Sequence, residues 1–582
     1  MSPPPPPLPR KAILLAAGFG SRLAPLTDHI PKPLLPYNGV PLIQHLMQQF
    51  ARAGVRDILV NLHHRADVLL RELPACTPPG VRLHLSFEPT ILGTGGALRR
   101  MSWFFDDTPL SPLWLCNADI AIHLDPTAIA RAFHAETTPP LAALWMIPDQ
   151  GPRTVRLSGN RVVDFRSGGD TFSGLHLLSP KLLDFIPPEE SFSSVISAYE
   201  AAMHTGATIL GIRIPGSRWA DLGTPDQYLD AHQGQSVVMN GAQVHPHTRL
   251  QRAIVAPGAR LRARHTATGI VLPPHWCLSP AEQQWTPKAE AVEVLPARGS
   301  DRALYRIFTP NNTFILIRTG TQRPENLRHA PHTRFLTQHN IRVPALYHAS
   351  PDERTLLLED LGRTHLLDQP TPANTRNALQ CIAQLHRIPN WQSQSLEPPF
   401  SPDLYHWEHT LFAREFLHRH DPHTDPAPIL QALNEIAHSL HNEPHVLIHR
   451  DLQSTNFLIH RREPVLIDFQ GMRAGPAAYD LASFLADPYL NRPAHEQETW
   501  LAAYNQISAR PISIQTYRLA ATQRLIQALG AYGRLGAMPA TRRFRQFIPP
   551  ALQQLARWTP HPTLQKWTKG FLERQTRQNP LL

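Results

Sequence analysis

Two carboxylates and one amide near the end of the sequence have the types and the spacing that phosphoryl transfer needs. In "HRDLQSTN", Asp451 and Asn456 are five positions apart, and Asp468 follows in the apolar run "VLIDF". This spacing brings a base and two oxygen ligands for a metal ion into one loop region. We expect Asp451 to orient and deprotonate an acceptor hydroxyl, and Asn456 and Asp468 to hold Mg²⁺ on the phosphates of ATP.

A glycine-rich turn with two basic residues near the start of the sequence could hold a second nucleotide. The strand pattern "KAILLAAG" runs into "FGSRLAPLTDHIPKP", so the backbone N–H groups of Ala17, Gly18 and Gly20 can approach a triphosphate. Arg22 and Lys32 bring positive charge to the same place. The turn lacks the third glycine of a dinucleotide fingerprint and the Gly-Lys-Ser/Thr of a Walker loop. It is therefore a phosphate-binding loop of another kind.

Four further motifs follow this turn: "EPTILGTGGAL" (88–98), "LCNADI" (115–120), "TFSGLHLLSP" (171–180) and "WADLGTPDQYLDA" (219–231). With the turn, and in this order, they resemble the sugar-1-phosphate nucleotidyltransferases over roughly residues 11 to 233. This resemblance implies a doubly wound α/β sheet with its ligands at the carboxyl ends of the strands. It also implies that Gly93 lets the nucleobase approach the backbone and that Gly174 lies against the sugar.

Two aspartates in these motifs are the metal ligands that the resemblance implies. Asp119 ends a buried apolar strand, and Asp221 lies in a separate turn. In these enzymes a sugar-1-phosphate oxygen attacks the α-phosphorus of a nucleoside triphosphate and expels pyrophosphate. Mg²⁺ bound by carboxylates neutralises the charge that develops. By the same resemblance, Arg22 would contact the leaving phosphates and Lys32 the reacting phosphates.

The segment of residues 234–294 connects the two regions and has an apolar step of six residues. Small and turn-forming residues separate these positions, which is typical of the coils of a left-handed β-helix. The alternative is a proline-rich linker whose residues happen to alternate. The apolar positions form two runs with this step, Val238, Val244 and Leu250, and then Val255 and Leu261.

Two strands and a hinge are expected in residues 295–582, before the "HRDLQSTN" motif. The runs "LPARGSDRALYRIF" and "TFILIRT" indicate two strands joined by a turn. In a kinase-like lobe this order places Ser300 over the ATP phosphates and Arg318 at the position of a basic residue that contacts phosphate. The run "TLLLEDLG" indicates a strand that enters the hinge between two lobes, where the backbone near Asp360 would face adenine.

The residues after Asp468 argue against a protein kinase. Gln470 stands where glycine is expected, no Ala-Pro-Glu follows, and "GPAAYDLASFL" comes within a few residues, so a segment that holds a peptide has no room. The region resembles the aminoglycoside-phosphotransferase-like kinases. Among them it is most similar to the bacterial kinases that phosphorylate the anomeric hydroxyl of N-acetylmuramic acid and N-acetylglucosamine. The run "FQGM" departs from their pattern, which has an acidic residue after Phe-Gln. We expect Asp480 to brace the catalytic loop.

The composition of the chain indicates two or more domains and no membrane segment. Its 582 residues exceed what one hydrophobic core accommodates. The net charge is +10, but the basic residues are scattered and not interleaved with aromatic residues, so we expect no nucleic-acid partner. No apolar run reaches membrane-spanning length, and the 4 cysteines lie far apart. We therefore expect a cytoplasmic protein with a disordered, proline-rich arm at residues 1–10.

The two regions would share one chemical intermediate, because an anomeric kinase makes a sugar-1-phosphate and the resembled N-terminal family consumes one. The resemblance predicts a bifunctional salvage enzyme that uses ATP, UTP or another nucleoside triphosphate, an amino sugar and its 1-phosphate. Such an enzyme is similar to a fusion of an amino-sugar kinase with N-acetylmuramate α-1-phosphate uridylyltransferase. The alternatives are a choline kinase with a cytidylyltransferase, a hexose or heptose kinase with a guanylyltransferase, and a degenerate scaffold or sensor. The sequence does not select the sugar, the base or the oligomeric state.

Overall fold

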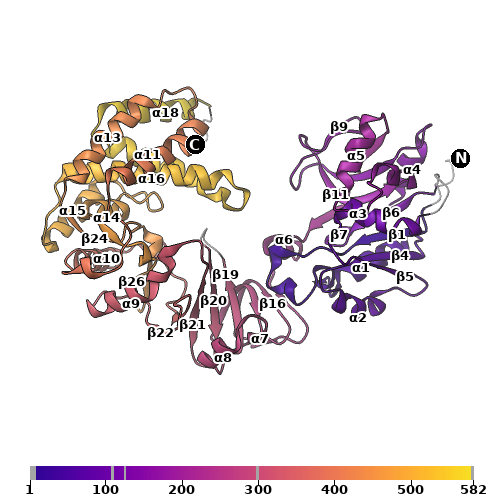
Figure 1. The fold of residues 1–582 in the computed structure, drawn as a ribbon, viewed down its shortest axis with the longest axis horizontal. Coiled ribbons are helices and arrows are strands. Elements are labelled where there is room, and N and C mark those ends of the chain that lie inside the picture. Colours follow the sequence, from indigo (N-terminus) through magenta and orange to yellow (C-terminus); the bar gives the residue numbers. More distant parts are fainter. Residues whose placement is uncertain (1–7, 106–110, 124–125, 297–300, 579–582) are drawn as a thin grey trace. The chain divides into compact units, whose positions relative to one another are not determined.

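The computed structural model of the chain describes residues 8–105, 111–123, 126–296 and 301–578. Figure 1 shows its ribbon. The chain divides into two compact units, and each is described here by itself. The first unit consists of residues 1–295 and 307–312, and the second of residues 296–306 and 313–582.

A nine-stranded mixed sheet forms the centre of the first unit, in the order β5-β4-β1-β6-β11-β8-β12-β10-β9. The first four strands are parallel, and β11 runs antiparallel to both of its neighbours. The α/β class expected from the sequence is thus confirmed, and the sheet is mixed because β11 runs antiparallel. The strands are β1 (Lys11–Leu15), β4 (Asp57–Leu62), β5 (Arg82–Phe87), β6 (Leu113–Asn117), β8 (Ala142–Ile147), β9 (Arg156–Ser158), β10 (Arg161–Asp164), β11 (Thr171–Leu178) and β12 (Ile209–Arg213).

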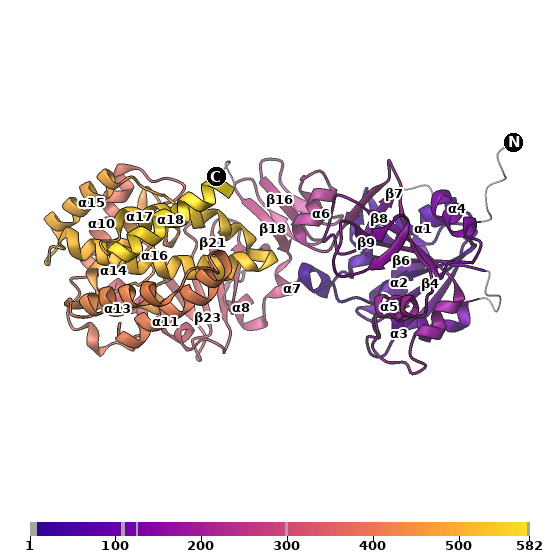
Figure 2. The ribbon, with the colours of Figure 1, turned by 90° about the horizontal axis from the view of Figure 1, so that it is seen from above.

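Helices cover both faces of this sheet, which explains the continuous apolar runs of its strands. In β1, Ala12 and Leu14 join one apolar core, and Ile13 joins the core on the opposite face. Helices α3 and α5 lie side by side on the Ile13 face (Figure 2). The helices are α1 (Leu42–Arg52), α2 (Ala66–Cys76), α3 (Gly93–Arg100), α4 (Thr127–Ala135), α5 (Val195–His204) and α6 (Pro225–Ala231).

Short parallel strands stack in the segment after α6. Val237 pairs with Ile254, Gln243 with Arg260, and Arg249 with Thr266, each pair in parallel. Parallel stacking of this kind is what the six-residue apolar step predicts, while the left-handed winding stays a prediction. The elements are β14 (Val237–Val238), β15 (Gln243–Val244), β16 (Arg249–Val255), β17 (Arg260–Leu261), β18 (Thr266–Leu272), α7 (Pro274–Cys277), α8 (Pro280–Trp285) and β19 (Ala291–Leu295).

The second unit begins with strands in the order β20-β21-β23-β22. Helix α9 packs against them, because Ala330 of the helix lies in one apolar cluster with Ile317 and Leu356 of the strands. This part confirms the two strands expected before the catalytic loop and the apolar strand expected before the hinge. The elements are β20 (Arg302–Phe308), β21 (Thr313–Thr319), α9 (His329–Gln338), β22 (Leu346–Ala349) and β23 (Thr355–Glu359).

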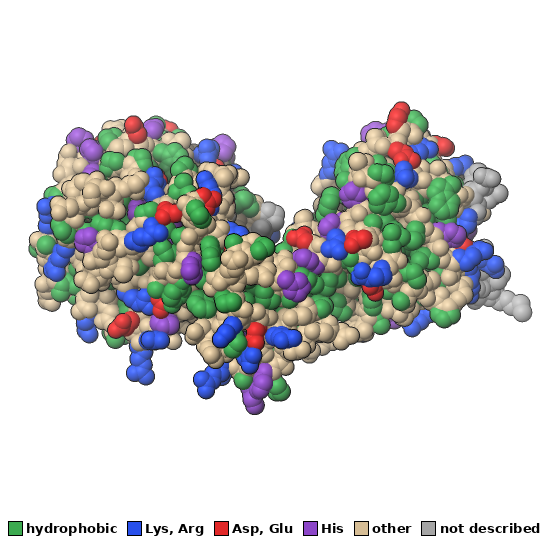
Figure 3. Space-filling view, turned by 60° about the horizontal axis from the view of Figure 1, so that its bottom comes forward, with side chains coloured by type: hydrophobic (Ala, Val, Ile, Leu, Met, Phe, Trp, Pro, Cys, Tyr) green, Lys and Arg blue, Asp and Glu red, His purple; other side chains and the backbone are tan. Residues whose placement is uncertain are grey.

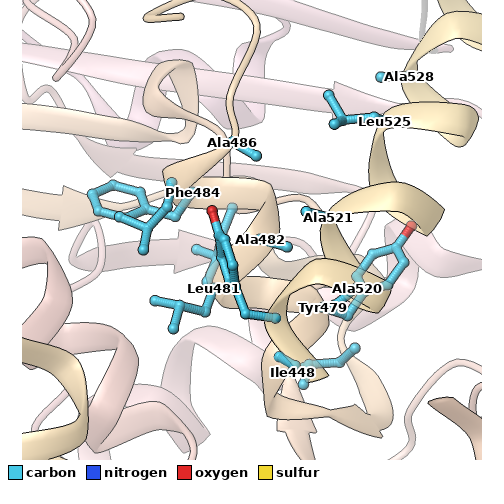
Figure 4. Packing of buried hydrophobic residues seen from close by; sticks show 14 of the residues in the cluster. Ile448, Tyr479, Leu481, Ala482, Phe484, Ala486, Ala520, Ala521, Leu525 and Ala528 are labelled. Atoms are coloured by element: carbon cyan, nitrogen blue, oxygen red, sulfur yellow. The ribbon is translucent and has the colours of Figure 1, made fainter. Parts of the chain in front are cut away.

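The rest of the second unit is mainly helical and surrounds one large apolar core. Small residues at the contact of α14 and α16, such as Ala482, Ala520 and Ala521, allow these helices to approach closely (Figure 4). The helices are α10 (Pro372–Leu385), α11 (Pro402–Phe412), α13 (Ala427–His441), α14 (Ala477–Leu485), α15 (Ala494–Ile507), α16 (Ile514–Ala537), α17 (Ile548–Trp558) and α18 (Pro562–Gln578). Two antiparallel strand pairs accompany them: β24 (His445–Ile448) with β27 (Arg473–Pro476), and the hairpin of β25 (Phe457–His460) with β26 (Glu463–Leu466).

The structure shows how basic side chains are distributed on one face and how apolar the helices are. On the face shown in Figure 3, Lys and Arg side chains are dispersed among other types and do not form one continuous basic tract. Within the described part of the chain, none of the helices has the length and apolar character needed to cross a bilayer.

Candidate active sites

A cavity of about 230 Å³ lies at the carboxyl ends of β1 and β6 in the first unit. The glycine-rich turn after β1 forms one wall. Gly20 has a left-handed backbone with φ +63°, and the Thr27 hydroxyl donates a hydrogen bond to the Gly20 carbonyl over 3.0 Å. The lining residues are Leu15, Ala16, Gly18, Gly20, Ser21, Arg22, Lys32, Pro33, Ala118, Asp119 and Gly223.

Lys32 joins the two aspartates that are expected to hold a metal ion. Its Nζ lies 2.7 Å from Asp119 Oδ2 and 4.0 Å from Asp221 Oδ1. Asp119 stands between β6 and β7 (Ile120–His123), and β7 pairs antiparallel with β13 (Arg218–Asp221), so that Asp221 faces Ile120. The Lys32 side chain is only 6% exposed, while that of Asp119 is 40% exposed. The fold thus brings one cation and two accessible carboxylates, far apart in the sequence, to one place.

The turn that follows Asp221 also accommodates Arg22. A Cβ atom at Gly223 would overlap the Arg22 guanidinium and approach Asp221 Oδ1 to 2.9 Å. Only glycine therefore allows Arg22 to lie across this turn. Ala17 is buried at the start of the same loop, next to Gly18, whose Cβ position is open.

The two glycines assigned to base and sugar have different surroundings. Gly93 has φ +67°, and a Cβ there would lie 2.5 Å from the carbonyl oxygen of Ser193. Gly174 has φ +91°, and a Cβ there would lie 2.8 Å from Asn117 Nδ2, two residues before Asp119. Glycine at 174 is thus already required by its protein neighbours, and its contact with a sugar stays a prediction.

A buried hydrogen-bond chain that the sequence analysis missed links β1 to the segment before α3. The backbone N–H of Ala16 donates to Asn61 Oδ1 over 2.6 Å, and Asn61 Nδ2 donates to Glu88 Oε1 over 2.6 Å. The other oxygen of Glu88 accepts the backbone N–H of Leu92 over 3.0 Å. Glu88 begins the "EPTILGTGGAL" motif, which was the available signal. This chain fixes the glycine-rich turn relative to Gly93.

His63 and His64 support the same turn. His63 Nδ1 lies 2.8 Å from the Glu88 carbonyl, and His64 Nε2 lies 2.8 Å from the Thr27 carbonyl. Both rings contact the ring of Phe19, which stands between the two glycines of the turn. The two histidines therefore have a structural role.

The residues of the "HRDLQSTN" motif and Asp468 come together in the second unit. Asn456 Nδ2 donates to the Asp451 carbonyl over 2.7 Å and lies 3.5 Å from Asp451 Oδ2. The N–H of Ile467 donates to the Asn456 carbonyl over 3.0 Å, which places the next residue, Asp468, beside the loop. The expected base and both expected metal ligands thus share one region.

Asp468 has a left-handed backbone with φ +65° and contacts one cation in the structure. Its Oδ1 lies 2.9 Å from Arg302 Nη2 and accepts a hydrogen bond from Gln470 Nε2 over 3.0 Å. Burial acts to raise the pKa of Asp468, but the charge of Arg302 and the hydrogen bond from Gln470 outweigh it, so the pKa lies below its usual value. The structure therefore favours the charged carboxylate of Asp468, and its role as a metal ligand stays a prediction.

Asp480 braces the catalytic loop, as the sequence analysis expects. Its fully buried carboxylate accepts the backbone N–H groups of His449 and Arg450, each over 2.7 Å. His386 Nε2 lies 3.3 Å from the same carboxylate. Arg450 has φ +79°, and these bonds hold the loop in that strained conformation.

The expected nucleotide contacts before this loop are only partly described. Ser300 lies outside the described residues. Arg318 is on β21, and its guanidinium lies 5.0 Å from the ring centre of Tyr305. The carboxylate of Asp360 forms a buried, bidentate ion pair with Arg306, with distances of 2.6 and 3.0 Å. The Asp360 side chain is thus structural, and only its backbone remains available for the predicted contact with adenine.

Arg524 is a cation beside Asp451, the expected base, and the sequence motifs do not predict it. Its Nη2 lies 2.5 Å from Asp451 Oδ1, although 73 residues separate the two in the chain. No motif spacing signals a pair of this kind.

Two family models match separate parts of this chain. Residues 11–155 match the nucleotidyl transferase family, and residues 293–521 match the phosphotransferase enzyme family. The chain therefore carries a nucleotidyltransferase domain followed by a phosphotransferase domain.

Three curated relatives are similar to part of the chain. A UTP–glucose-1-phosphate uridylyltransferase of Synechocystis sp. is 25% identical over 40% of this chain and 67% of its own length. A mannose-1-phosphate guanylyltransferase of Mycobacterium tuberculosis is 26% identical over 43% of this chain and 77% of its own. A mannose-1-phosphate guanyltransferase of Schizosaccharomyces pombe is 30% identical over 38% of this chain and 62% of its own, which is less than two thirds.

Solved structures of two nucleotidyltransferases also match part of the chain. The inositol-1-phosphate CTP transferase from T. maritima is 17% identical with a TM-score of 0.33, over 38% of this chain and 92% of that one. A UDP-glucose pyrophosphorylase from Acinetobacter baumannii is 18% identical with a TM-score of 0.32, over 39% of this chain and 94% of that one.

Proposed function

We propose that the protein converts a free amino sugar into a nucleotide sugar in two steps. The phosphotransferase domain phosphorylates the anomeric hydroxyl of N-acetylmuramate or N-acetylglucosamine with ATP. The nucleotidyltransferase domain then transfers the nucleotidyl group of UTP to the sugar-1-phosphate and releases pyrophosphate. This is the chemistry by which a bacterial cytoplasm would recover sugars during peptidoglycan recycling.

One observation carries this proposal: a single chain holds a phosphotransferase domain and a nucleotidyltransferase domain. The relatives of the chain include enzymes whose names specify sugar-1-phosphates. A phosphate at C1 is the only sugar phosphate that such a domain can use, so a kinase that supplies C1 phosphate gives its neighbour a substrate. A kinase acting on another hydroxyl would leave the two domains unconnected.

The kinase step rests on the groups around Asp451. Asp451 accepts the proton of the acceptor hydroxyl while the sugar oxygen attacks the γ-phosphorus and ADP leaves. Asn456 and Asp468 offer the oxygen ligands that Mg²⁺ prefers, and Mg²⁺ would neutralise charge on the phosphates. After Asp468 the chain forms one short turn and enters β27 at Arg473. That compact connection favours a small acceptor over an extended peptide.

The nucleotidyl step rests on the cavity of the first unit. Asp119 and Asp221 present oxygen donors beside Lys32, which fits a hard divalent cation such as Mg²⁺. In this proposal Lys32 binds the reacting phosphate, and Arg22 binds the phosphates that leave as pyrophosphate. The N–H groups of Ala17, Gly18 and Gly20 contact the triphosphate, where glycine lets the backbone approach.

A second candidate, a hexose or heptose kinase joined to a guanylyltransferase, is favoured by a different observation. Several relatives carry the name mannose-1-phosphate guanyltransferase. In this version the two sites and their residues keep the same roles, and only the sugar and the base change. A choline kinase joined to a cytidylyltransferase is the remaining alternative.

One assay separates these candidates. The purified full-length protein is incubated with ATP and Mg²⁺, with UTP, GTP or CTP, and with N-acetylmuramate, N-acetylglucosamine, mannose or choline, and the products are identified by mass spectrometry. We expect a UDP-amino sugar. GDP-mannose would support the second candidate, CDP-choline the third, and the absence of any phosphorylated acceptor would refute the kinase step.

Two variants assign each step to its site. Asp451→Ala is expected to lose sugar phosphorylation but to convert supplied sugar-1-phosphate. Asp119→Ala is expected to show the reverse. Independent sites are wrong if either variant loses both activities while it remains folded.

A further inference from the structure

The carboxylate of Asp451 is held differently at its two oxygens. Oδ1 pairs with Arg524 Nη2 at 2.5 Å. Oδ2 has only longer contacts, to Gln453 Nε2 at 3.2 Å and to Asn456 Nδ2 at 3.5 Å. The side chain of Asp451 is 43% exposed, while that of Arg524 is 11% exposed. Asp451 Oδ2 is therefore the less tightly held oxygen, and the exposure of the side chain allows a substrate to reach this carboxylate.

Arg524 is itself fixed by the helices behind the catalytic loop. Its Nε donates to the Ser483 hydroxyl on α14 over 2.9 Å, and its Nη1 bonds to Gln527 Oε1 on its own helix, α16. Helices α14 and α16 are in contact through small residues, so Arg524 and Ser483 are close in space (Figure 4 shows this contact). All three nitrogens of the guanidinium thus have a partner, and its plane is set by two rigid elements.

Arg524 keeps its positive charge in this buried place. Burial alone would lower the pKa of Arg524, but the negative charge of Asp451 raises this pKa by more than burial lowers it. The pKa of Arg524 therefore lies above its usual value. The bond between the two residues is therefore a charge-assisted hydrogen bond, which is shorter and stronger than a neutral one.

We propose that Arg524 is a positioning residue of the phosphotransferase that holds Asp451 Oδ1 and so presents Oδ2 to the acceptor hydroxyl. The inference rests on the proposed role of Asp451 as the base. During transfer, the O–H bond of the acceptor breaks and its proton goes to Oδ2, while the acceptor oxygen bonds to the γ-phosphorus and ADP leaves with the electrons of the broken P–O bond. Arg524 touches none of the reacting atoms.

Without Arg524 the carboxylate can rotate, and the fraction of bound complexes with Oδ2 at the hydroxyl falls. This affects the chemical step and leaves substrate affinity nearly unchanged, because the residue is expected to bind neither ATP nor sugar. The loss of a charge-assisted hydrogen bond of this kind corresponds to a decrease in kcat of about 10- to 100-fold. A helix-stabilising role alone would not separate kcat from KM in this way.

The test uses the full-length protein in three variants: Arg524→Gln, Arg524→Lys and the matched control Arg518→Gln. Arg518 lies on the same helix but donates to the Trp558 carbonyl over 3.2 Å, away from Asp451. We expect kcat for sugar phosphorylation to fall about 10- to 100-fold in Arg524→Gln and less in Arg524→Lys, with KM values for ATP and sugar within about threefold. Arg518→Gln is expected to keep the wild-type kcat.

A chemical rescue experiment distinguishes loss of the guanidinium group from loss of stability in a variant. In Arg524→Ala, millimolar guanidinium is expected to restore part of kcat, while urea at the same concentration is not, and nucleotidyl transfer by the same sample reports that the protein is folded. Unchanged kcat in Arg524→Gln would overturn the inference. So would a change confined to KM for acidic sugars, which would make Arg524 an anion-binding residue.

The variant Asp451→Asn separates failure of the inference from failure of the proposed function. If Asp451→Asn still phosphorylates the sugar, the proposed function fails. If Asp451→Asn is inactive but Arg524→Gln has the wild-type kcat, only the inference about Arg524 is refuted.

Discussion

Substituting Gly93 by alanine tests how the nucleotidyl site is built. Gly93 has φ +67°, and a Cβ atom there would lie 2.5 Å from the Ser193 carbonyl oxygen and 3.2 Å from the Phe192 ring. The Ser193 oxygen already accepts the N–H of Gly95 over 2.8 Å. Since the obstacle is a hydrogen-bonded backbone atom and not the end of a side chain, the segment before α3 must move.

The effect of Gly93→Ala has two parts, the cost of the left-handed backbone and the displacement of neighbouring atoms. Gly39→Ala measures the first part by itself. The left-handed backbone costs alanine about 1–2 kcal/mol. Gly39→Ala carries the same backbone cost, because Gly39 has φ +84° but no atom within 4 Å of its Cβ position. The additional loss in Gly93→Ala comes from the displaced segment. A displacement of about 1 Å at a positioned substrate can lower the rate about 100-fold, so we expect kcat/KM for the nucleoside triphosphate to fall by about 10- to 100-fold.

The assay measures pyrophosphate release from the nucleoside triphosphate and supplied sugar-1-phosphate, with thermal unfolding of each variant recorded in parallel. Gly39→Ala is expected to lose stability but to keep its kcat/KM, and both variants are expected to keep sugar phosphorylation. Equal kcat/KM in Gly93→Ala and Gly39→Ala would show that the close approach at Gly93 has no part in nucleotide binding.

Three further predictions concern stability, pH and metal. Asp480→Asn replaces the buried acceptor of two loop N–H groups, so the free energy of unfolding of the second unit should fall by about 1–3 kcal/mol and kinase activity should be lost, as urea unfolding and the two assays would reveal. Burial lowers the pKa of His176 to about 3, beneath its unfolded value of 6.5, so its contribution to stability is complete above pH 6.5 and is lost by roughly 1 kcal/mol per pH unit as the pH falls below it. Urea titrations at pH 7 and pH 5.5 should therefore show a smaller pH effect in His176→Gln, and an equal effect would contradict this origin. Both activities should disappear in EDTA and return with Mg²⁺, and inhibition by a zinc-selective chelator in excess Mg²⁺ would argue against oxygen-ligated Mg²⁺ sites.

The sequence predicts the proximity of functional side chains where they belong to one short motif. Asp451 and Asn456 share one loop, so their spacing alone predicts their proximity. The carboxyl-end rule for α/β sheets gave the place of Asp119 after an apolar strand. The roles of these residues in binding and catalysis stay predictions, as do the domain boundaries at residues 10, 233 and 294.

Pairs that only tertiary packing creates could not be predicted. Arg524 reaches Asp451 because α14 and α16 pack closely. No sequence pattern between the two residues predicts this contact. The place of Asp360 after an apolar strand predicts a hinge backbone there, but it does not predict that the Asp360 side chain pairs with Arg306 from another strand. The sequence around a buried aspartate does not predict which basic residue will form an ion pair with it.

The position of the phosphate on the sugar tests the central proposal most directly. The Asp119→Ala variant is incubated with ATP, UTP, Mg²⁺ and N-acetylmuramate, and the product that accumulates is analysed by NMR. We predict phosphorus–proton coupling at C1 and no nucleotide sugar, and the wild-type protein should consume the same product in the presence of UTP. Coupling at C6, in a product that keeps its reducing end, would contradict the link between the two domains.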